Sequence, residues 1–124
     1  MAKILIADDH EDVRRAMSLL LEDEGYETLE AIDGEETIEK ANDASPSLIL
    51  LDMAMPRMDG IEALKQLKAS TETKHIPVIM VTAQNDKDRM VHAVRLGLRD
   101  FINKPWSNTE LLETVDTVIA SNAA

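Results

Sequence analysis

The run Leu48-Ile49-Leu50-Leu51-Asp52 decides the fold, because four consecutive apolar residues end abruptly in a carboxylate. A run this short is too brief for a helix, and continuous apolarity is typical of a strand that is buried on both faces. Similar runs occur at residues 4–7 and 78–81, and a shorter one occurs at residues 101–102. The sequence therefore predicts four strands of a sheet that is covered on both sides.

Residues 26–31 form a fifth strand-like segment, in which apolar and polar side chains alternate. Leu29 and Ala31 fall on one side of this segment, and Thr28 and Glu30 fall on the other. Such alternation is typical of an exposed edge strand, so we expect this segment at an edge of the sheet.

Amphipathic helices are predicted between the strands, because apolar side chains recur there at the spacing of helical turns. The residues with this spacing are Val13, Met17, Leu20 and Leu21; Ile38 and Ala41; Ile61, Leu64 and Leu67; Met90, Val94 and Leu98; and Leu111, Val115 and Val118. Capping-box pairs predict three helix starts and two glycines predict helix ends. The pairs are Asp33 with Glu36, Asp59 with Glu62 and Ser107 with Glu110, and the glycines are Gly25 and Gly97.

The strict alternation of five strands with five helices predicts an α/β fold with a parallel sheet between two layers of helices. The flavodoxin-like doubly wound (βα)5 arrangement, with strand order 2-1-3-4-5, places residues 26–31 at an edge, as their pattern requires. The chain has the usual length of one domain, so we expect a single domain over residues 1–124.

The composition excludes several classes of function. The chain has 24 acidic and 13 basic residues and a net charge of -11, so direct binding to nucleic acid is not expected. The absence of cysteine excludes thiol catalysis and cysteine-bound metals. The apolar runs are too short to span a bilayer. The first strand-like segment begins at residue 4, which leaves no room for a signal peptide. We therefore expect no membrane association and a cytoplasmic location.

Three carboxylates are predicted to converge, since Asp8 and Asp9 end the first strand and Asp52 ends the third. In this strand order, the ligand crevice lies beyond the carboxyl ends of those strands. Mutual repulsion indicates a cation between the carboxylates, and Mg²⁺, with Mn²⁺ as the alternative, would take oxygen ligands and leave room for a phosphoryl group. Asp8 or Asp9 alone is interpreted equally well as a helix cap.

The same crevice should receive a hydroxyl and an ammonium group. Thr82 ends the fourth strand, and the fifth strand leads into Lys104. Either residue alone has a simpler interpretation, as a helix cap or as an exposed lysine. Their positions at successive strand ends favour a role in holding phosphate oxygens.

Taken together, these motifs resemble the receiver domains of bacterial response regulators, of the chemotaxis-regulator type, over the whole chain. The segments that carry the resemblance are Asp8-Asp9, residues 51–60 (LDMAMPRMDG), Val81-Thr82-Ala83 and Lys104-Pro105. The resemblance implies a phospho-accepting signalling domain and not an enzyme, although such a domain assists its own phosphotransfer and dephosphorylation. It also implies a cis peptide bond between Lys104 and Pro105.

The resemblance assigns a role to each matching residue. Asp52 would accept a phosphoryl group from the phosphohistidine of a histidine kinase. Asp8, Asp9 and Asp52 would hold Mg²⁺ together with the backbone carbonyl of Ala54. Thr82 and Lys104 would bind the phosphoryl oxygens. Electrostatic positioning of this kind supports attack by a carboxylate on phosphorus.

Phe101 lies three residues before the lysine, where the family has an aromatic residue that rotates as Thr82 moves inward. The resemblance therefore implies a two-state switch at Thr82 and Phe101, and a plain core residue is the other interpretation of Phe101. Leu98 and Trp106 depart from the residues usual in the family, so local packing near the output surface is expected to be unusual. Ala54 and Gln84 occupy variable positions beside the phosphoryl group.

The expected partners are a sensor histidine kinase or phosphotransfer protein, and an output protein or domain that the sequence does not identify. The resemblance places output on the fourth helix, fifth strand and fifth helix, and kinase recognition partly around Arg14 and Met17. The fifth helix carries Glu110, Glu113 and Asp116 without a basic residue. We therefore expect a monomer that docks on a partner when phosphorylated.

Three other functions would each need a different pattern of residues around the acidic site. A phosphatase with an aspartate nucleophile would need a second acid where Ala54 stands, and a flavin site would need hydroxyls and glycines in the acidic loop at residues 8–12. A receiver fold that serves only as an unphosphorylated interaction module remains the alternative.

His10 is expected to be exposed and not a ligand, because imidazole suits Zn²⁺ or Cu²⁺ better than Mg²⁺. His75 and His92 are expected at the surface.

Overall fold

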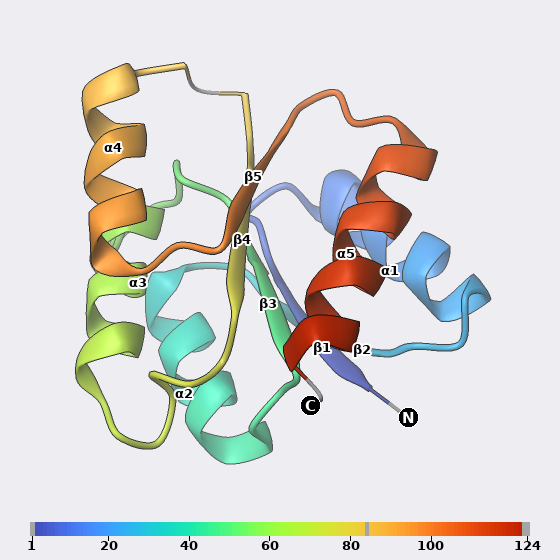
Figure 1. Cartoon of the computed structure of the whole chain (residues 1–124), viewed down its shortest axis with the longest axis horizontal. Helices are drawn as coiled ribbons and strands as arrows, with labels where there is room; N and C mark the ends of the chain where they lie inside the picture. The colour runs from blue at the N-terminus through green and yellow to red at the C-terminus, as the bar shows by residue number, and fades with distance from the viewer. Residues whose placement is uncertain (1, 84, 123–124) are drawn as a thin grey trace.

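The computed structural model describes residues 2–83 and 85–122, and within them the chain forms five strands and five helices in strict alternation (Figure 1). In order, the elements are β1 (Lys3–Ala7), α1 (Glu11–Asp23), β2 (Glu27–Ala31), α2 (Gly34–Ala44), β3 (Leu48–Leu51), α3 (Gly60–Ala69), β4 (Val78–Thr82), α4 (Lys87–Leu96), β5 (Asp100–Asn103) and α5 (Asn108–Asn122). None of these helices has both the length and the hydropathy that a bilayer crossing requires.

The strands form one parallel sheet with the order β2-β1-β3-β4-β5, so the predicted fold and strand order are confirmed. Ile4 pairs with Leu48 on one side of β1 and with Thr28 on the other, and Ile79 pairs with Asp100 at the far edge. Since all strands run in the same direction, their carboxyl ends meet at one edge of the sheet.

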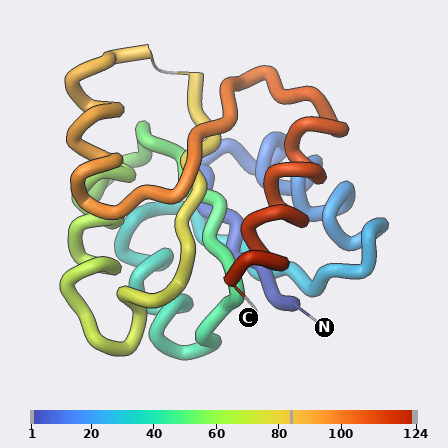
Figure 2. The backbone as a smooth tube through the Cα atoms, viewed as in Figure 1, coloured from blue at the N-terminus to red at the C-terminus, as the bar shows by residue number. Residues whose placement is uncertain are grey.

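Two separate cores explain why the central strands are apolar without alternation. On one face, Leu5 and Ile49 pack with residues of α2, α3 and α4; on the other, Ile4 and Leu48 pack with residues of α1 and α5. Figures 1 and 2 show these two groups of helices on opposite sides of the sheet. Every side chain of β3 is therefore buried, whichever way it points.

The edge strand β2 is less exposed than its alternating pattern predicts. Ala31 is buried in the core with α2 to α4, and Leu29 packs against that core. On the opposite side, Thr28 and Glu30 are half-buried because α1 covers them with polar side chains, as the 2.6 Å hydrogen bond between the hydroxyls of Ser18 and Thr28 shows. The polar face of β2 is thus an internal contact with α1.

Helix starts and ends follow the predicted signals. The caps Asp33, Asp59 and Ser107 accept hydrogen bonds from the backbone N–H groups of Glu36, Glu62 and Glu110, at 2.8, 2.9 and 3.3 Å. Gly97 ends α4 with a φ of 109°, and Gly25 follows α1 with a φ of 96°. Both glycines adopt a left-handed backbone that other residues enter only at a cost.

Candidate functional site

Two buried carboxylates lie side by side at the carboxyl edge of the sheet. Asp8 directly follows β1 and Asp52 directly follows β3; they are 0% and 5% exposed. The backbone N–H of Asp8 donates to the carbonyl of Ala31 at 3.1 Å, and that of Asp52 donates to the carbonyl of Ala7 at 2.9 Å. The sheet's hydrogen bonding therefore extends to both residues. Asp9, the residue after Asp8, lies in the exposed loop.

Lys104 completes this charge arrangement. Its Nζ lies 2.5 Å from Oδ2 of Asp8 and 3.4 Å from Oδ2 of Asp52, and its backbone N–H donates to the carbonyl of Thr82 at 3.1 Å. The Lys104–Pro105 peptide bond is cis, as expected. Thr82, the last residue of β4, is 2% exposed. The carboxyl ends of β1, β3, β4 and β5 thus supply the site.

Burial raises the pKa of Asp52, and the neighbouring Asp8 carboxylate raises it further, whereas the Lys104 ammonium opposes both effects. Desolvation penalises the charged form of a buried carboxyl group, and a nearby cation favours it. An additional cation between Asp8 and Asp52 would therefore keep Asp52 ionised, which is the form that can act as a nucleophile.

His10 lies closer to the site than the sequence predicts. It is exposed, as expected, with 64% of its side chain accessible, yet its Nδ1 lies 3.1 Å from Asp8 Oδ1 and 3.2 Å from Asp9 Oδ1. The hydrogen bond to Asp8 and the charges of Asp9 and Asp8 raise the pKa of His10. Adjacency to the acidic pair was the only sequence signal for this contact. His75 and His92 are exposed, as predicted.

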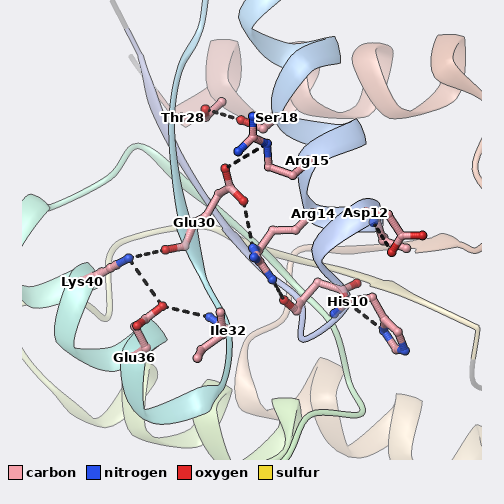
Figure 3. A network of polar contacts seen from close by, with 12 residues as sticks. His10, Asp12, Arg14, Arg15, Ser18, Thr28, Glu30, Ile32, Glu36 and Lys40 are labelled. Carbon is pink, nitrogen blue, oxygen red and sulfur yellow. Dashed lines mark hydrogen bonds and ion pairs between the residues drawn. The ribbon is translucent and has the colours of Figure 1, made fainter.

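Arg14 and Met17, around which kinase recognition is expected, are both buried, so a partner that docks on this part of α1 would meet neighbouring side chains instead. Met17 is 1% exposed and lies in the core beneath α1. Arg14 is 9% exposed, and its guanidinium joins the carbonyl of Asp8 to the carboxylate of Glu30 (Figure 3). Both residues occupy the inner side of α1; Leu19, which is 61% exposed, lies on its outer side.

The loop after β3 is held by close backbone contacts. The N–H of Ala54 lies 3.4 Å from Asp52 Oδ1, and the N–H of Gly60 donates to the carbonyl of Met53 at 2.7 Å. Arg57 has a left-handed φ of 67°, and its side chain pairs with the buried Asp33 at 3.2 Å. The start of α2 and the start of α3 therefore both contact this loop.

Two of the residues at or near the expected output surface, Phe101 and Trp106, are partly buried. Phe101 is half-buried and lines an apolar groove with residues of α4. Leu98 is in the core, and Trp106 is half-buried with its Nε1 donating to Asn108 Oδ1 at 3.2 Å. Gln84 lies outside the described residues.

The donor set fits a hard divalent cation. Asp8, Asp9, His10 and Asp52 each offer a ligand atom, and these atoms lie within 4.8 Å of one another. Carboxylate oxygens are the ligands that Mg²⁺ prefers, and the exposed position of Asp9 leaves one side open to water or phosphate. Two of the carboxylates are buried beside a single ammonium group, so the site has unbalanced negative charge that a cation would neutralise.

The fold and the acidic edge of the sheet are those of a receiver domain of two-component systems. The chain belongs to the response regulator receiver domain family, whose sequence model matches residues 4–116. Protein PilH of Pseudomonas aeruginosa is 36% identical over 97% of this chain and 99% of its own length. The chemotaxis protein CheY4 of Vibrio cholerae has a TM-score of 0.90 and 33% identity, over 95% of this chain and 98% of that one.

Other relatives are longer than this chain. The transcriptional regulatory protein PhoB of Escherichia coli is 34% identical over 94% of this chain, which spans 51% of PhoB. The receiver domain of a signal transduction histidine kinase from Syntrophus aciditrophicus has a TM-score of 0.90 and 30% identity, over 98% of this chain and 92% of that one. Receiver domains like this chain therefore occur both alone and within larger proteins.

Proposed function

We propose that this chain is a phosphorelay receiver that accepts a phosphoryl group on Asp52 from the phosphohistidine of a sensor histidine kinase or phosphotransfer protein. The observation that carries the proposal is the placement of the Lys104 ammonium against two buried carboxylates, 2.5 Å from Asp8 and 3.4 Å from Asp52. A carboxylate nucleophile beside a fixed ammonium group is suited to phosphoryl transfer, which depends chiefly on positioning and charge neutralisation.

Each site residue has a defined part in the reaction. Asp52 attacks phosphorus with a carboxylate oxygen, and the bond between phosphorus and the donor imidazole nitrogen breaks as that nitrogen takes back its electron pair. Lys104 moves from the carboxylates to a phosphoryl oxygen, and the hydroxyl of Thr82 binds another. Lys104 Nζ already lies within reach of both carboxylates, which supports this assignment.

Asp8, Asp9, Asp52 and the backbone carbonyl of Ala54 would hold Mg²⁺, with Mn²⁺ as a substitute. The bound ion would supply charge neutralisation between the carboxylates and the incoming phosphoryl oxygens. Ligand atoms of Asp8, Asp9 and Asp52 lie within 4.8 Å of one another, which supports the three carboxylate ligands of this assignment.

The phosphorylated chain signals through the surface of α4, β5 and α5, with Thr82 and Phe101 as the switch. Two apolar side chains of α4, Val91 and Val94, are 49% and 57% exposed beside Phe101, which favours a docking surface there. The chain acts as one domain over residues 1–124, docks as a monomer on an output protein or domain, and does not bind nucleic acid directly. Sedimentation that shows a dimer induced by beryllofluoride would contradict the monomer.

The test is the intact mass of the protein after incubation with acetyl phosphate, with and without Mg²⁺. We expect one phosphoryl adduct, formed only with Mg²⁺ and absent in Asp52→Asn, while Asp43→Asn, a change to an exposed carboxylate of α2, keeps the adduct. If acetyl phosphate gives no adduct, the same comparison is made with a phosphorylated histidine kinase as donor. Failure with both donors would favour an unphosphorylated interaction module.

A further inference from the structure

We infer that Arg14 is a positioning residue for the metal site, because it fixes the backbone of the acidic loop from which Asp8 and Asp9 project. This inference rests on the proposed function, since it concerns the same site. In the described structure, the side chain of Arg14 bonds to Glu30 and to the Asp8 carbonyl, and not to Asp52 or Lys104, so its effect would pass through the loop.

The contacts of Arg14 join two elements that approach the site from different sides. Its Nη1 donates to the carbonyl of Asp8 at 2.9 Å, and its Nε donates to Glu30 Oε1 on β2 at 2.8 Å (Figure 3). The N–H of Asp8 is already bound to the carbonyl of Ala31, also on β2. Both backbone polar groups of Asp8 are therefore fixed, one by the edge strand and one by α1.

Peptide planarity extends this constraint to the next residue. The carbonyl of Asp8 and the N–H of Asp9 belong to the same rigid peptide plane, so a bond that fixes the carbonyl also fixes the direction in which the chain enters Asp9. Asp9 is exposed, and its carboxylate contacts the exposed ring of His10 at 3.2 Å. The Arg14 bond is thus a buried restraint on the peptide plane before Asp9, while the N–H of His10, on the peptide plane after Asp9, donates to Asp8 Oδ1 at 2.9 Å.

The burial of Arg14 makes the restraint a firm one. Its guanidinium side chain is only 11% exposed, and Glu30, its partner, is held in turn by Lys40 of α2, which donates to the Glu30 carbonyl. Hydrogen bonds between charged groups are shorter and stronger than neutral ones. The planar guanidinium spans two acceptors, whereas a lysine ammonium could not keep the same two directions.

A positioning role and a purely electrostatic role of Arg14 predict opposite changes in Mg²⁺ affinity when its side chain is removed. A guanidinium group repels a divalent cation, so loss of its charge alone would strengthen Mg²⁺ binding. Loss of a positioning contact would weaken Mg²⁺ binding, and removal of groups that orient metal ligands commonly costs about tenfold or more in affinity. The direction of the change in Kd therefore decides between the two roles.

The experiment is calorimetric titration of Mg²⁺ into four variants of the full chain. We expect Arg14→Ala to weaken Mg²⁺ binding about tenfold and Arg14→Lys to recover only part of the loss. Arg15→Ala is the matched control, because Arg15 also faces Glu30 but at 4.0 Å and with 60% of its side chain exposed; it should bind Mg²⁺ as the wild type does. Leu21→Ala controls for stability, since it removes a fully buried side chain from the same helix.

An unchanged or tighter Mg²⁺ affinity in Arg14→Ala overturns the inference. Equal weakening in Leu21→Ala also overturns it, because general loosening of α1 would then explain the loss. The acetyl phosphate assay separates this inference from the proposed function. A wild type that is phosphorylated on Asp52 while Arg14→Ala keeps its Mg²⁺ affinity refutes only the role of Arg14, whereas a wild type that binds Mg²⁺ without forming an adduct from any donor refutes only the function.

Discussion

Gly60 lies so close to the backbone of Asp52 that a Cβ atom added to it would stand 2.3 Å from the Asp52 carbonyl oxygen. The contact joins the first residue of α3 to the backbone of Asp52, which directly follows β3 and is the proposed nucleophile. The loop between them can close only because residue 60 has no side chain.

Gly60→Ala is therefore expected to displace Asp52 and to destabilise the fold by about 1–3 kcal/mol, the usual cost of forcing an extra methyl into a packed site. Helix propensity alone would predict the opposite sign, a gain of about 1 kcal/mol for alanine in a helix. Urea unfolding gives the sign, and the acetyl phosphate assay shows whether Asp52 has moved.

Gly25→Ala is the control for this change. Gly25 has a φ of 96° and no atom within 4 Å of an added Cβ, so only backbone strain is introduced there. The free energy of unfolding of the Gly25→Ala protein should fall, while its phosphorylation by acetyl phosphate stays at the wild-type level. A Gly60→Ala protein that is as stable and as reactive as the wild type would contradict the close packing described for this loop.

Lys104→Met should lower the free energy of unfolding by about 3–5 kcal/mol when measured in the presence of a metal chelator, because it leaves two buried carboxylates without their cation. The loss should be largely recovered when Asp52→Asn is added, since the repulsion is then relieved. Lys3→Met is the matched control: Lys3 pairs with Glu27 at 3.8 Å on the exposed edge and should contribute less than about 1 kcal/mol. Equal costs for the two lysines would refute the buried charge arrangement.

His10 should titrate above the ordinary histidine value when followed by NMR in chelator, because its hydrogen bond to Asp8 and the charge of Asp9 favour the imidazolium. A pKa raised by folding means that the protonated ring stabilises the folded state below the unfolded pKa, and that this contribution is lost as the pH rises through the folded pKa. Mg²⁺ should reverse the shift, since the ion neutralises the same carboxylates. A His10 pKa that is independent of Mg²⁺ would contradict the proposed metal position.

Tyr26 should titrate at about pH 12, because burial raises its pKa from the usual 10 and its hydroxyl donates to Asp116 of α5. Folding stability should therefore fall as the pH rises from 10 towards 12, where the unfolded chain loses the phenolic proton first. Tyr26 is the single tyrosine, so ultraviolet absorbance of the phenolate reports this site alone.

Asp116→Asn tests the cause of the Tyr26 shift. It should lower the midpoint of the titration but leave it above the ordinary tyrosine value, because desolvation is the larger contribution. Circular dichroism at each pH shows whether the chain is still folded. A midpoint near 10 in the folded wild type would show that α5 does not cover Tyr26.

The fold was predictable from the sequence because its central strands are buried on both faces. Residues such as Leu48 and Ile49 face different cores, so both must be apolar, and the resulting runs are hard to confuse with amphipathic helices. Strand order then followed from the alternating pattern at residues 26–31, and the place where Asp8 and Asp52 meet followed from strand order.

The contacts around Arg14 and Asp33 were not predictable in the same way. No local pattern marks the polar Arg14 as buried, because its partner Glu30 lies 16 residues away on a strand that α1 covers. Asp33 is a helix cap, as its capping-box spacing predicts, yet its carboxylate also pairs with the exposed side chain of Arg57, 24 residues away. Pairings of this kind arise from tertiary packing and leave no local periodicity.

The ion pair between Asp8 and Lys104 has a consequence for the making of the protein, because 96 residues separate its two partners. The ribosome synthesises Asp8 and Asp52 before Lys104, so a nascent chain shorter than 104 residues carries the carboxylates of the site without their ammonium group. Contacts between such distant residues also form late in folding, after the loop that joins them has closed. Any chemistry that needs Lys104 can therefore begin only after residue 104 has been synthesised and has folded back onto Asp8 and Asp52.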